Sequence, residues 1–267
     1  MARKLITIIA VILLVCSSAV ALFCVFRSYS GLPRNHPAYE AAERITKEGI
    51  VEGFGDGGKY FAEDAGVSAQ ELICALYRID GEVPVTPTFE GLSLGSISEE
   101  EYAKAFEWAA YNGIIFCTYS VGSTVEGIDG YISEAFRYDD IEYYVSMLED
   151  ADEDTGYAIS GAVPSGLKIK DITCSDSVLA MYYYACDYLN MEITSYDDTD
   201  IASQAMYKLY NKSTIQLEEA DIISASWNWA LDAGIVEPYA DNTLRPDATL
   251  TRAEFAVMLD RFMDYVK

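Results

Sequence analysis

The sequence contains a single histidine, His36, and no pair of cysteines in a CxxC spacing. Zinc sites and serine–histidine or cysteine–histidine catalytic centres depend on these residues. His36 follows a long hydrophobic run within a short polar stretch, which is a poor place for a preorganised site. The sequence therefore predicts no metal, no cofactor and no catalytic centre of these kinds.

Basic residues are also scarce, with 18 Lys and Arg against 43 Asp and Glu and a formal net charge of −25. Because nucleic-acid binding relies on a basic surface, nucleic acid is excluded as an expected partner. A catalytic carboxylate pair needs a fixed separation across a cleft, and acids this frequent give no indication of one. We therefore predict a non-enzymatic protein.

Six cysteines are present, and Cys16 and Cys24 lie inside the N-terminal hydrophobic run. Cys174 and Cys186 are twelve positions apart on one predicted helix. They would lie about 18 Å apart along its axis, which is too far for a disulfide. We expect buried thiols at all four cysteines beyond the run: Cys74, Cys117, Cys174 and Cys186.

The N-terminal run 5–26 is uncharged and follows Arg3 and Lys4. A helix of this length can cross the roughly 30 Å core of a bilayer, which predicts a membrane anchor. The small residues Ala19 and Ala21 equally fit the cleavage site of a signal peptide. Both alternatives place the chain from the tether 27–36 onward outside the cytoplasm.

The stretch Ser224–Phe262 is predicted to form a helix, a loop and a second helix. The first helix ends at Gly234, a residue suited to the left-handed conformation beyond a helix. Thr251 and Glu254 then form a capping box that opens the second helix. Apolar residues behind this cap recur at helical spacing: Phe255, Met258, Leu259 and Phe262.

The same pattern occurs earlier in the chain. Gly49–Glu52 aligns with Gly234–Glu237, and the pair Ser68 and Glu71 aligns with Thr251 and Glu254. Such a unit has too little apolar surface to fold alone, so the copies are expected to pack together.

A further copy is indicated by Trp108 and Gly113, which align with Trp229 and Gly234. If its second helix is Thr173–Tyr188, residues 118–168 form an insertion that carries its own helix. The alternative takes Asp139–Leu148 as the second helix and residues 150–220 as a linker.

We therefore predict a mainly α fold of three helix–loop–helix repeats, in which the capping-box helices form a bundle and an apolar N-terminal helix precedes it. The predicted segments are the anchor or signal 1–26, the tether 27–36, a first repeat 37–81, a second repeat 98–190, and a connecting helix with the third repeat 191–267.

The third repeat resembles the S-layer homology family of bacterial surface proteins. The resemblance is carried, in order, by Trp229–Ala230, Gly234–Val236, Leu244–Asp247 and Leu250–Glu254. It implies that the three repeats form a pseudo-threefold bundle. It also implies that the partner is a secondary cell-wall polysaccharide.

Arg252 is the sharpest candidate for a binding residue, because the macrodipole does not favour a cation in the first turn of a helix. The resemblance implies that Arg252 contacts acidic groups of the glycan, with Trp229, Gly234 and Glu254 as further binding residues. The alternative is a surface arginine paired with an acid such as Asp247. Two aligned positions lack the cation: Ala69 and Cys174.

These observations favour a non-enzymatic cell-surface protein that binds cell-wall glycan. Loss of the cation from two repeats favours an alternative, a membrane-anchored scaffold whose repeats contact other proteins. An enzyme with its active site in the 118–168 insertion is a third reading. We expect Arg252→Ala to abolish wall binding with the fold intact.

Overall fold

The computed structural model describes ten parts of the chain: residues 31–54, 58, 60–85, 92–93, 100–115, 117–123, 131–136, 157–162, 171–192 and 217–267. Its centre consists of three helices, α3 (Ala69–Ile79), α6 (Cys174–Tyr183) and α9 (Arg252–Tyr265). A short π-helical segment, η1 (Tyr184–Tyr188), continues α6. The predicted mainly helical architecture is confirmed.

Each central helix begins with a complete capping box. The hydroxyl at the N-cap accepts from the third helical N–H, and the acidic side chain at that third position accepts from the N-cap N–H. Both contacts satisfy backbone donors that a helix leaves unpaired. The pairs are Ser68 with Glu71, Thr173 with Asp176, and Thr251 with Glu254. The helix expected from Thr173 is therefore present.

The three residues that precede the caps form a closed ring of backbone hydrogen bonds. The Val67 N–H donates to the Leu250 oxygen at 3.0 Å, and the Leu250 N–H donates to the Ile172 oxygen at 3.0 Å. The Ile172 N–H closes the ring by donating to the Val67 oxygen at 2.8 Å. Segments distant in sequence thus enter the core side by side.

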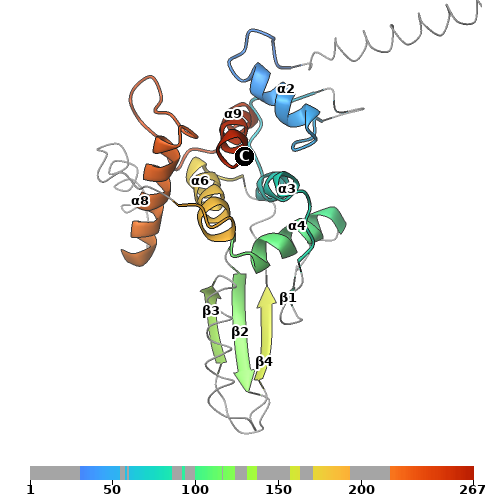
Figure 1. Cartoon of the computed structure of the whole chain (residues 1–267), viewed down its shortest axis with the longest axis vertical. Coiled ribbons are helices and arrows are strands. Elements are labelled where there is room, and N and C mark those ends of the chain that lie inside the picture. Colours follow the sequence, from blue (N-terminus) through green and yellow to red (C-terminus); the bar gives the residue numbers. More distant parts are fainter. Residues whose placement is uncertain are drawn as a thin grey trace, which may run out of the picture.

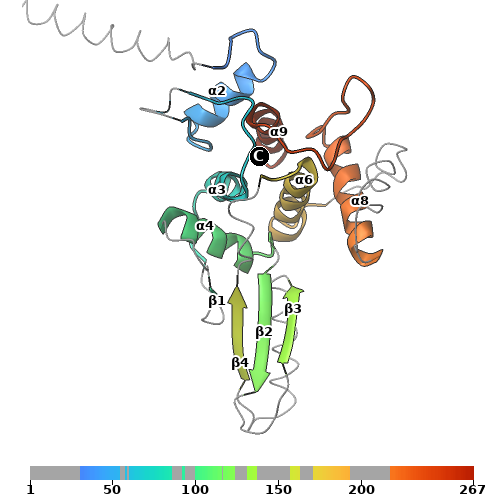
Figure 2. The ribbon, with the colours of Figure 1, turned by 180° about the vertical axis from the view of Figure 1, so that it is seen from behind.

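Three outer helices, α2 (Tyr39–Lys47), α4 (Glu100–Tyr111) and α8 (Leu217–Asp232), pack on α9, α3 and α6 respectively (Figures 1 and 2). Each ends just before a glycine with positive φ. The glycines are Gly49 (77°), Gly113 (64°) and Gly234 (67°). Left-handed residues are the ordinary way to end a helix, so all three predicted helix ends are found.

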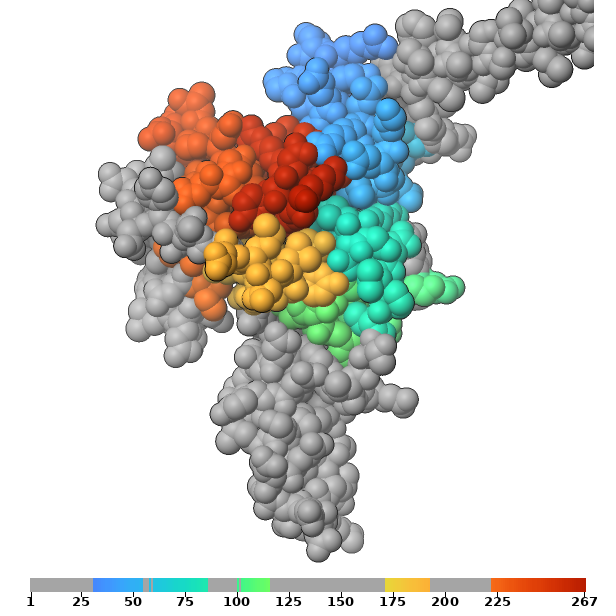
Figure 3. All heavy atoms as spheres, in the orientation of Figure 1, coloured from blue at the N-terminus to red at the C-terminus, as the bar shows by residue number. Residues whose placement is uncertain are grey.

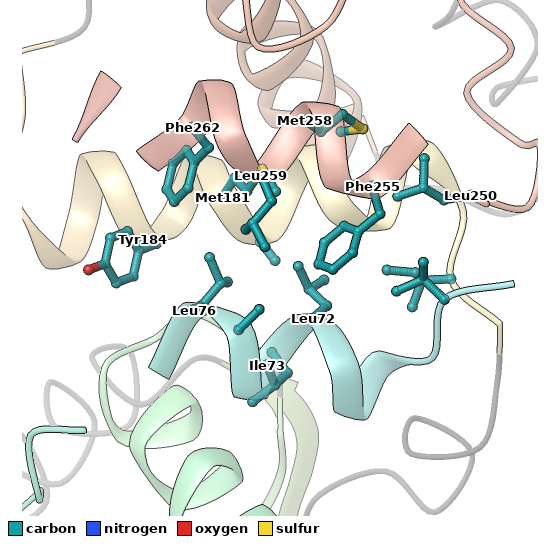
Figure 4. Packing of buried hydrophobic residues seen from close by; sticks show 14 of the residues in the cluster. Leu72, Ile73, Leu76, Met181, Tyr184, Leu250, Phe255, Met258, Leu259 and Phe262 are labelled. Atoms are coloured by element: carbon teal, nitrogen blue, oxygen red, sulfur yellow. The ribbon is translucent and has the colours of Figure 1, made fainter. Parts of the chain in front are cut away.

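The apolar core lies between the three central helices (Figure 4). Leu72 and Leu76 of α3 face Met181 of α6, with Phe255 and Leu259 of α9 completing the contact. Each of these side chains is at most 5% exposed. Burial of one such side chain stabilises the fold by about 1.5–3 kcal/mol, so this contact dominates the packing.

A four-stranded sheet extends from the helical part (Figure 1). Its strands are β1 (Leu92–Ser93), β2 (Cys117–Ser123), β3 (Tyr131–Phe136) and β4 (Tyr157–Ala162), in the order β1-β4-β2-β3. β2 pairs antiparallel with β3 and with β4, while β1 is parallel to β4. These strands were not predicted, and the helix expected at 139–149 lies outside the described residues.

Other predictions also fall outside the described part of the chain, including the N-terminal run 5–26, the capping residue Ser98 and the helix 201–210. Among the helices that the structure does describe, none combines the length and the apolar character needed to cross a bilayer. In Figure 3 the atoms of α2 (blue), α3 (teal), α6 (yellow) and α9 (red) lie against one another as one continuous body.

Candidate functional site

Arg252 is the first residue of α9, and its guanidinium group is buried rather than presented to solvent. The residue is 2% exposed, and its backbone N–H donates to the Ala65 oxygen at 2.9 Å. The side chain donates from Nε to the Phe61 oxygen at 2.8 Å and from Nη2 to the Glu52 oxygen at 2.7 Å. Nη1 forms an ion pair with Glu71. Arg252 thus joins the last helix to the first helix–loop–helix unit.

Two aromatic rings complete the surroundings of this guanidinium. Its carbon lies 4.4 Å from the centre of the Phe54 ring and 5.0 Å from that of Phe61. Both distances allow cation–π attraction. Burial lowers the pKa of Arg252 to about 10, so the group stays protonated at neutral pH. The alternative of a surface arginine paired with Asp247 does not describe this residue.

A groove of about 370 Å³ lies where Arg252 meets the first unit. We call it the Arg252 groove, and it is lined by Ile50, Val51, Glu52, Gly53, Phe54, Ser68, Glu71, Cys74, Arg78, Tyr102 and Arg252. Arg78 donates to the Ile50 oxygen at 3.2 Å and to the Glu52 carboxylate at 3.1 Å. Two guanidinium groups therefore line one groove of a strongly acidic protein.

A second groove, of about 690 Å³, lies beside α9. We call it the Cys174 groove. Its lining is mostly apolar and includes Trp227, Ile235, Val236, Leu244, Leu250, Val257 and Met258. The Tyr239 hydroxyl donates to Glu254 Oε1 at 2.6 Å, and Arg261 pairs with Glu237 at 2.9 Å. Cys174 lies where the other groove holds an arginine.

The two grooves have the same backbone frame. The Arg252 and Ala253 N–H groups donate to the oxygens of residues 65 and 63, at 2.9 and 3.1 Å. The Cys174 and Ser175 N–H groups donate to the oxygens of residues 248 and 246, at 3.1 and 3.0 Å. Both turns also contain a non-glycine residue with positive φ, Ala62 in one and Arg245 in the other. The backbone contacts that hold Arg252 in one groove are therefore repeated at Cys174 in the other, while the side chains differ.

Glu254 has two partners within the Cys174 groove region. One oxygen accepts from the Thr251 backbone and hydroxyl, at 3.0 and 2.8 Å, while the other accepts from Tyr239. Burial acts to raise the pKa of Glu254, but the hydrogen bonds from Tyr239 and Thr251 outweigh it and the net pKa is lowered. Glu254 is therefore an anion at neutral pH.

Trp229 and Gly234 lie away from both groove linings. Trp229 is 2% exposed and packs edge-on against Tyr182, Phe262 and Tyr265, with ring centres 5.6, 6.3 and 5.6 Å away. Its Nε1 has no hydrogen-bond partner among the described residues. A Cβ added at Gly234 would meet nothing within 4 Å. Glycine is therefore favoured there by the positive φ and not by a closely packed neighbour.

Sequence reasoning missed Phe54, Arg78 and Tyr102 as groove residues. A signal was present for Arg78, since it aligns with Arg261 when the two capping boxes are superposed. Of the cysteines, Cys74 and Cys174 are buried as expected, whereas Cys186 is only partly buried. Within the described residues no cluster of potential metal ligands is present.

The S-layer homology domain model matches residues 221–256, which include most of α8 and the first turn of α9. This confirms the family resemblance for the segment that contains Trp229, Gly234, Arg252 and Glu254. Domains of this family bind cell-wall polymers and are not catalytic, consistent with a wall-associated protein of the cell surface. No curated protein matches the chain.

Proposed function

We propose that this protein binds an anionic cell-wall polysaccharide at the cell surface, and that the Arg252 groove is the binding site. The observation that carries the proposal is the pair of guanidinium groups, Arg78 and Arg252, beside the rings of Phe54 and Tyr102. Guanidinium groups bind carboxylates in a bidentate manner, and aromatic rings cover the apolar faces of sugars. The chain has a formal net charge of −25, so these two guanidinium groups are the feature of the groove that attracts a polyanion.

The proposal includes three equivalent units around a pseudo-threefold axis. It is supported by the ring formed by Val67, Ile172 and Leu250, and by the capping box after each of them. We propose the predicted boundaries with it: repeats at 37–81, 98–190 and 191–267, behind the segment 1–26 and the tether 27–36.

Within this site Arg252 supplies the charge at the floor of the groove. Its Nη1 is shared with Glu71, so an acidic sugar competes with Glu71 for this donor. Arg78 has 14% of its side chain exposed and gives the approaching anion a second guanidinium. Of the other predicted binding residues, Trp229 and Gly234 line neither groove and Glu254 lines the Cys174 groove, so they are not part of this proposed site.

The test uses Phe54→Ala, because Phe54 is 46% exposed and lines the groove. Tyr60→Ala is the matched control, since Tyr60 is 47% exposed, pairs with Phe54 through the backbone, and does not line the groove. In sedimentation with isolated cell walls, we expect Phe54→Ala to bind about tenfold more weakly and Tyr60→Ala to bind as the parent does.

Extraction of the secondary polymers from the walls should remove the binding of the parent protein. Equal sedimentation of both variants, or undiminished binding to extracted walls, would contradict the proposal.

The alternative of a protein-binding scaffold is favoured by the Cys174 groove. Its lining is largely apolar and its volume of about 690 Å³ is the larger of the two. Apolar grooves of this size are typical of sites for apolar ligands or side chains.

A further inference from the structure

The Cys174 groove retains the acceptors that hold Arg252 in the other groove. When the units are aligned on their glycines and caps, Glu254 takes the place of Glu71, and the Glu237 oxygen takes that of Glu52. The same alignment puts the Leu244 oxygen in the place of Phe61 and the Tyr239 ring in the place of Phe54. All four of these residues line the Cys174 groove: Glu237, Tyr239, Leu244 and Glu254.

The guanidinium group is the part that is missing. Cys174 is held by the same backbone hydrogen bonds as Arg252, but its side chain ends at Sγ and leaves the two carbonyl acceptors uncovered, while the Glu254 carboxylate accepts only from Tyr239 and Thr251. Among the described residues, no hydrogen bond reaches the backbone oxygens of Glu237 and Leu244. A donor that reaches these oxygens gains a hydrogen bond, and the gain is larger at Leu244, which is 5% exposed, than at Glu237, which is an exposed residue.

The charged groups around the Cys174 groove also favour a cationic ligand. Arg261 pairs with the Glu237 carboxylate at 2.9 Å, and Arg245 pairs with Asp241 at 3.0 Å while stacking on Tyr239 at 4.1 Å. Glu254 forms no ion pair among the described residues and receives hydrogen bonds only from neutral groups. The groove therefore offers one carboxylate to an additional cation.

We propose that the Cys174 groove is a receptor for an arginine side chain presented by a partner protein. The guanidinium group of the partner would lie between Glu254, the Glu237 oxygen and the Tyr239 ring, reproducing the contacts that Arg252 makes. Its alkyl stem would lie on Ile235 and Val236. The strongly acidic chain attracts a basic partner, which adds long-range complementarity. This site and its ligand are independent of the glycan bound in the Arg252 groove.

The shape of the groove favours arginine over lysine. A guanidinium carries five N–H donors in a planar fork, which suits one carboxylate and two carbonyls and stacks on a ring. An ammonium group offers a compact charge without the fork. When the units are aligned, Ala38 takes the place of Tyr102. Because the alanine side chain is small, the mouth of the Cys174 groove is open to a ligand.

The direct test titrates the full-length chain with the peptide acetyl-Gly-Arg-Gly-amide. The matched peptide carries citrulline, which has the same shape without the charge, and a third carries lysine. The methyl signal of Met258 and the indole signal of Trp227 report binding, since both residues line the groove. We expect the arginine peptide to bind at least about tenfold more tightly than the citrulline peptide. The lysine peptide is expected to fall between them.

Two variants locate the site. Cys174→Arg fills the groove from within and should abolish the response, while Cys174→Ser, close in size to the parent, should retain it. Glu254→Gln keeps an amide that can serve the helix cap and should remove the preference for arginine over citrulline. Phe54→Ala, which lies in the other groove, should respond to the arginine peptide as the parent does, so failure of either proposal can be told from failure of the other.

Three results would overturn the proposal. They are equal affinity for arginine and citrulline peptides, no response to the arginine peptide at millimolar concentration, and an undiminished response in Cys174→Arg. Self-association of the parent that is lost in Cys174→Arg would identify the arginine donor as a second copy and overturn the assignment to a different protein.

Discussion

The Arg252 groove and the Cys174 groove share the backbone hydrogen bonds that hold residues 252 and 174, but their side chains differ. In the first, a buried guanidinium group joins Glu71 to the carbonyls of two residues. In the second, the Tyr239 hydroxyl donates to the Glu254 carboxylate, and the rest of the groove is lined mostly by apolar side chains. The comparison indicates that the interface between units is held by the backbone frame and the core, which leaves the groove residues free to diverge.

The largest expected effect comes from Arg252→Ala. It removes one partner of a buried ion pair and leaves two carbonyls without donors, which typically costs about 3–5 kcal/mol. Cys174→Ala, at the equivalent position, should cost about 1 kcal/mol. Because Arg252 is buried, we now expect its removal to weaken the fold as well as wall binding. Urea denaturation measures the stability of both variants. Equal losses of stability would show that Arg252 does not join α9 to the first unit as described.

Replacement of each groove glutamate by glutamine should give the next largest difference in stability between the two grooves. Glu71→Gln leaves the charge of Arg252 without a counter-ion and should cost about 2 kcal/mol, below the value for a fully buried pair because the Glu71 side chain is 27% exposed. Glu254→Gln removes only hydrogen bonds with neutral groups and should cost about 1 kcal/mol. Denaturation midpoints provide the comparison. A greater loss from Glu254→Gln would reverse the assigned roles.

The helix caps at Thr251 and Thr173 should differ less in their contributions to stability. Thr251→Ala removes the hydroxyl that accepts from the Glu254 N–H and should cost about 1 kcal/mol. Thr173→Ala is the matched change in α6, where the capping contacts are exposed, and should cost no more than that. Thermal melts of both variants measure the difference. An unchanged melting temperature for Thr251→Ala would contradict the importance of its capping box.

The smallest expected effect is a dependence on pH. The folded pKa of Glu254 is lowered, so its contribution is present above the unfolded value near 4.5 and is lost as pH falls through the folded value. Parent and Glu254→Gln should therefore converge in stability as the pH falls below the unfolded value and through the lowered folded pKa of Glu254. Parallel curves over that range would show that Glu254 does not titrate as described.

Local features of the fold were predictable from the sequence. Capping boxes and helix-ending glycines act within a few residues, so Thr251 with Glu254 and the three glycines could be identified directly. The sheet was not anticipated, because its strands pair residues as distant as Leu92 and Gly161. Pairing over such separations depends on chain topology, which local patterns do not contain.

The site was predictable only in part. The position of Arg252 in a first helical turn indicated a reason other than helix stability. That reason is Glu71, 181 positions earlier in the chain, and nothing local to either residue identifies the other. The Cys174 groove exists because a short cysteine stands where the equivalent position, 252, has arginine. The alignment of the repeats had already shown that position 174 lacks a cation. The size of the groove depended on the packing of two other segments.

In the proposed ring of three units, the contacts between units do not depend on the order of the units along the chain. α2 at the start packs on α9 at the end, where Arg44 contacts Asp260 at 2.9 Å and Asp264 at 2.7 Å. The first and the last helix of the described chain therefore pack together, as α3 does with α4 and α6 with α8. A circular permutant that joins residue 267 to residue 31 through a linker, and opens instead between η1 and α8, would leave each proposed unit intact and keep the contacts of α2 with α9, α3 with α4 and α6 with α8. In the proposed arrangement, the break between the first and last unit is one of three places at which the ring can begin.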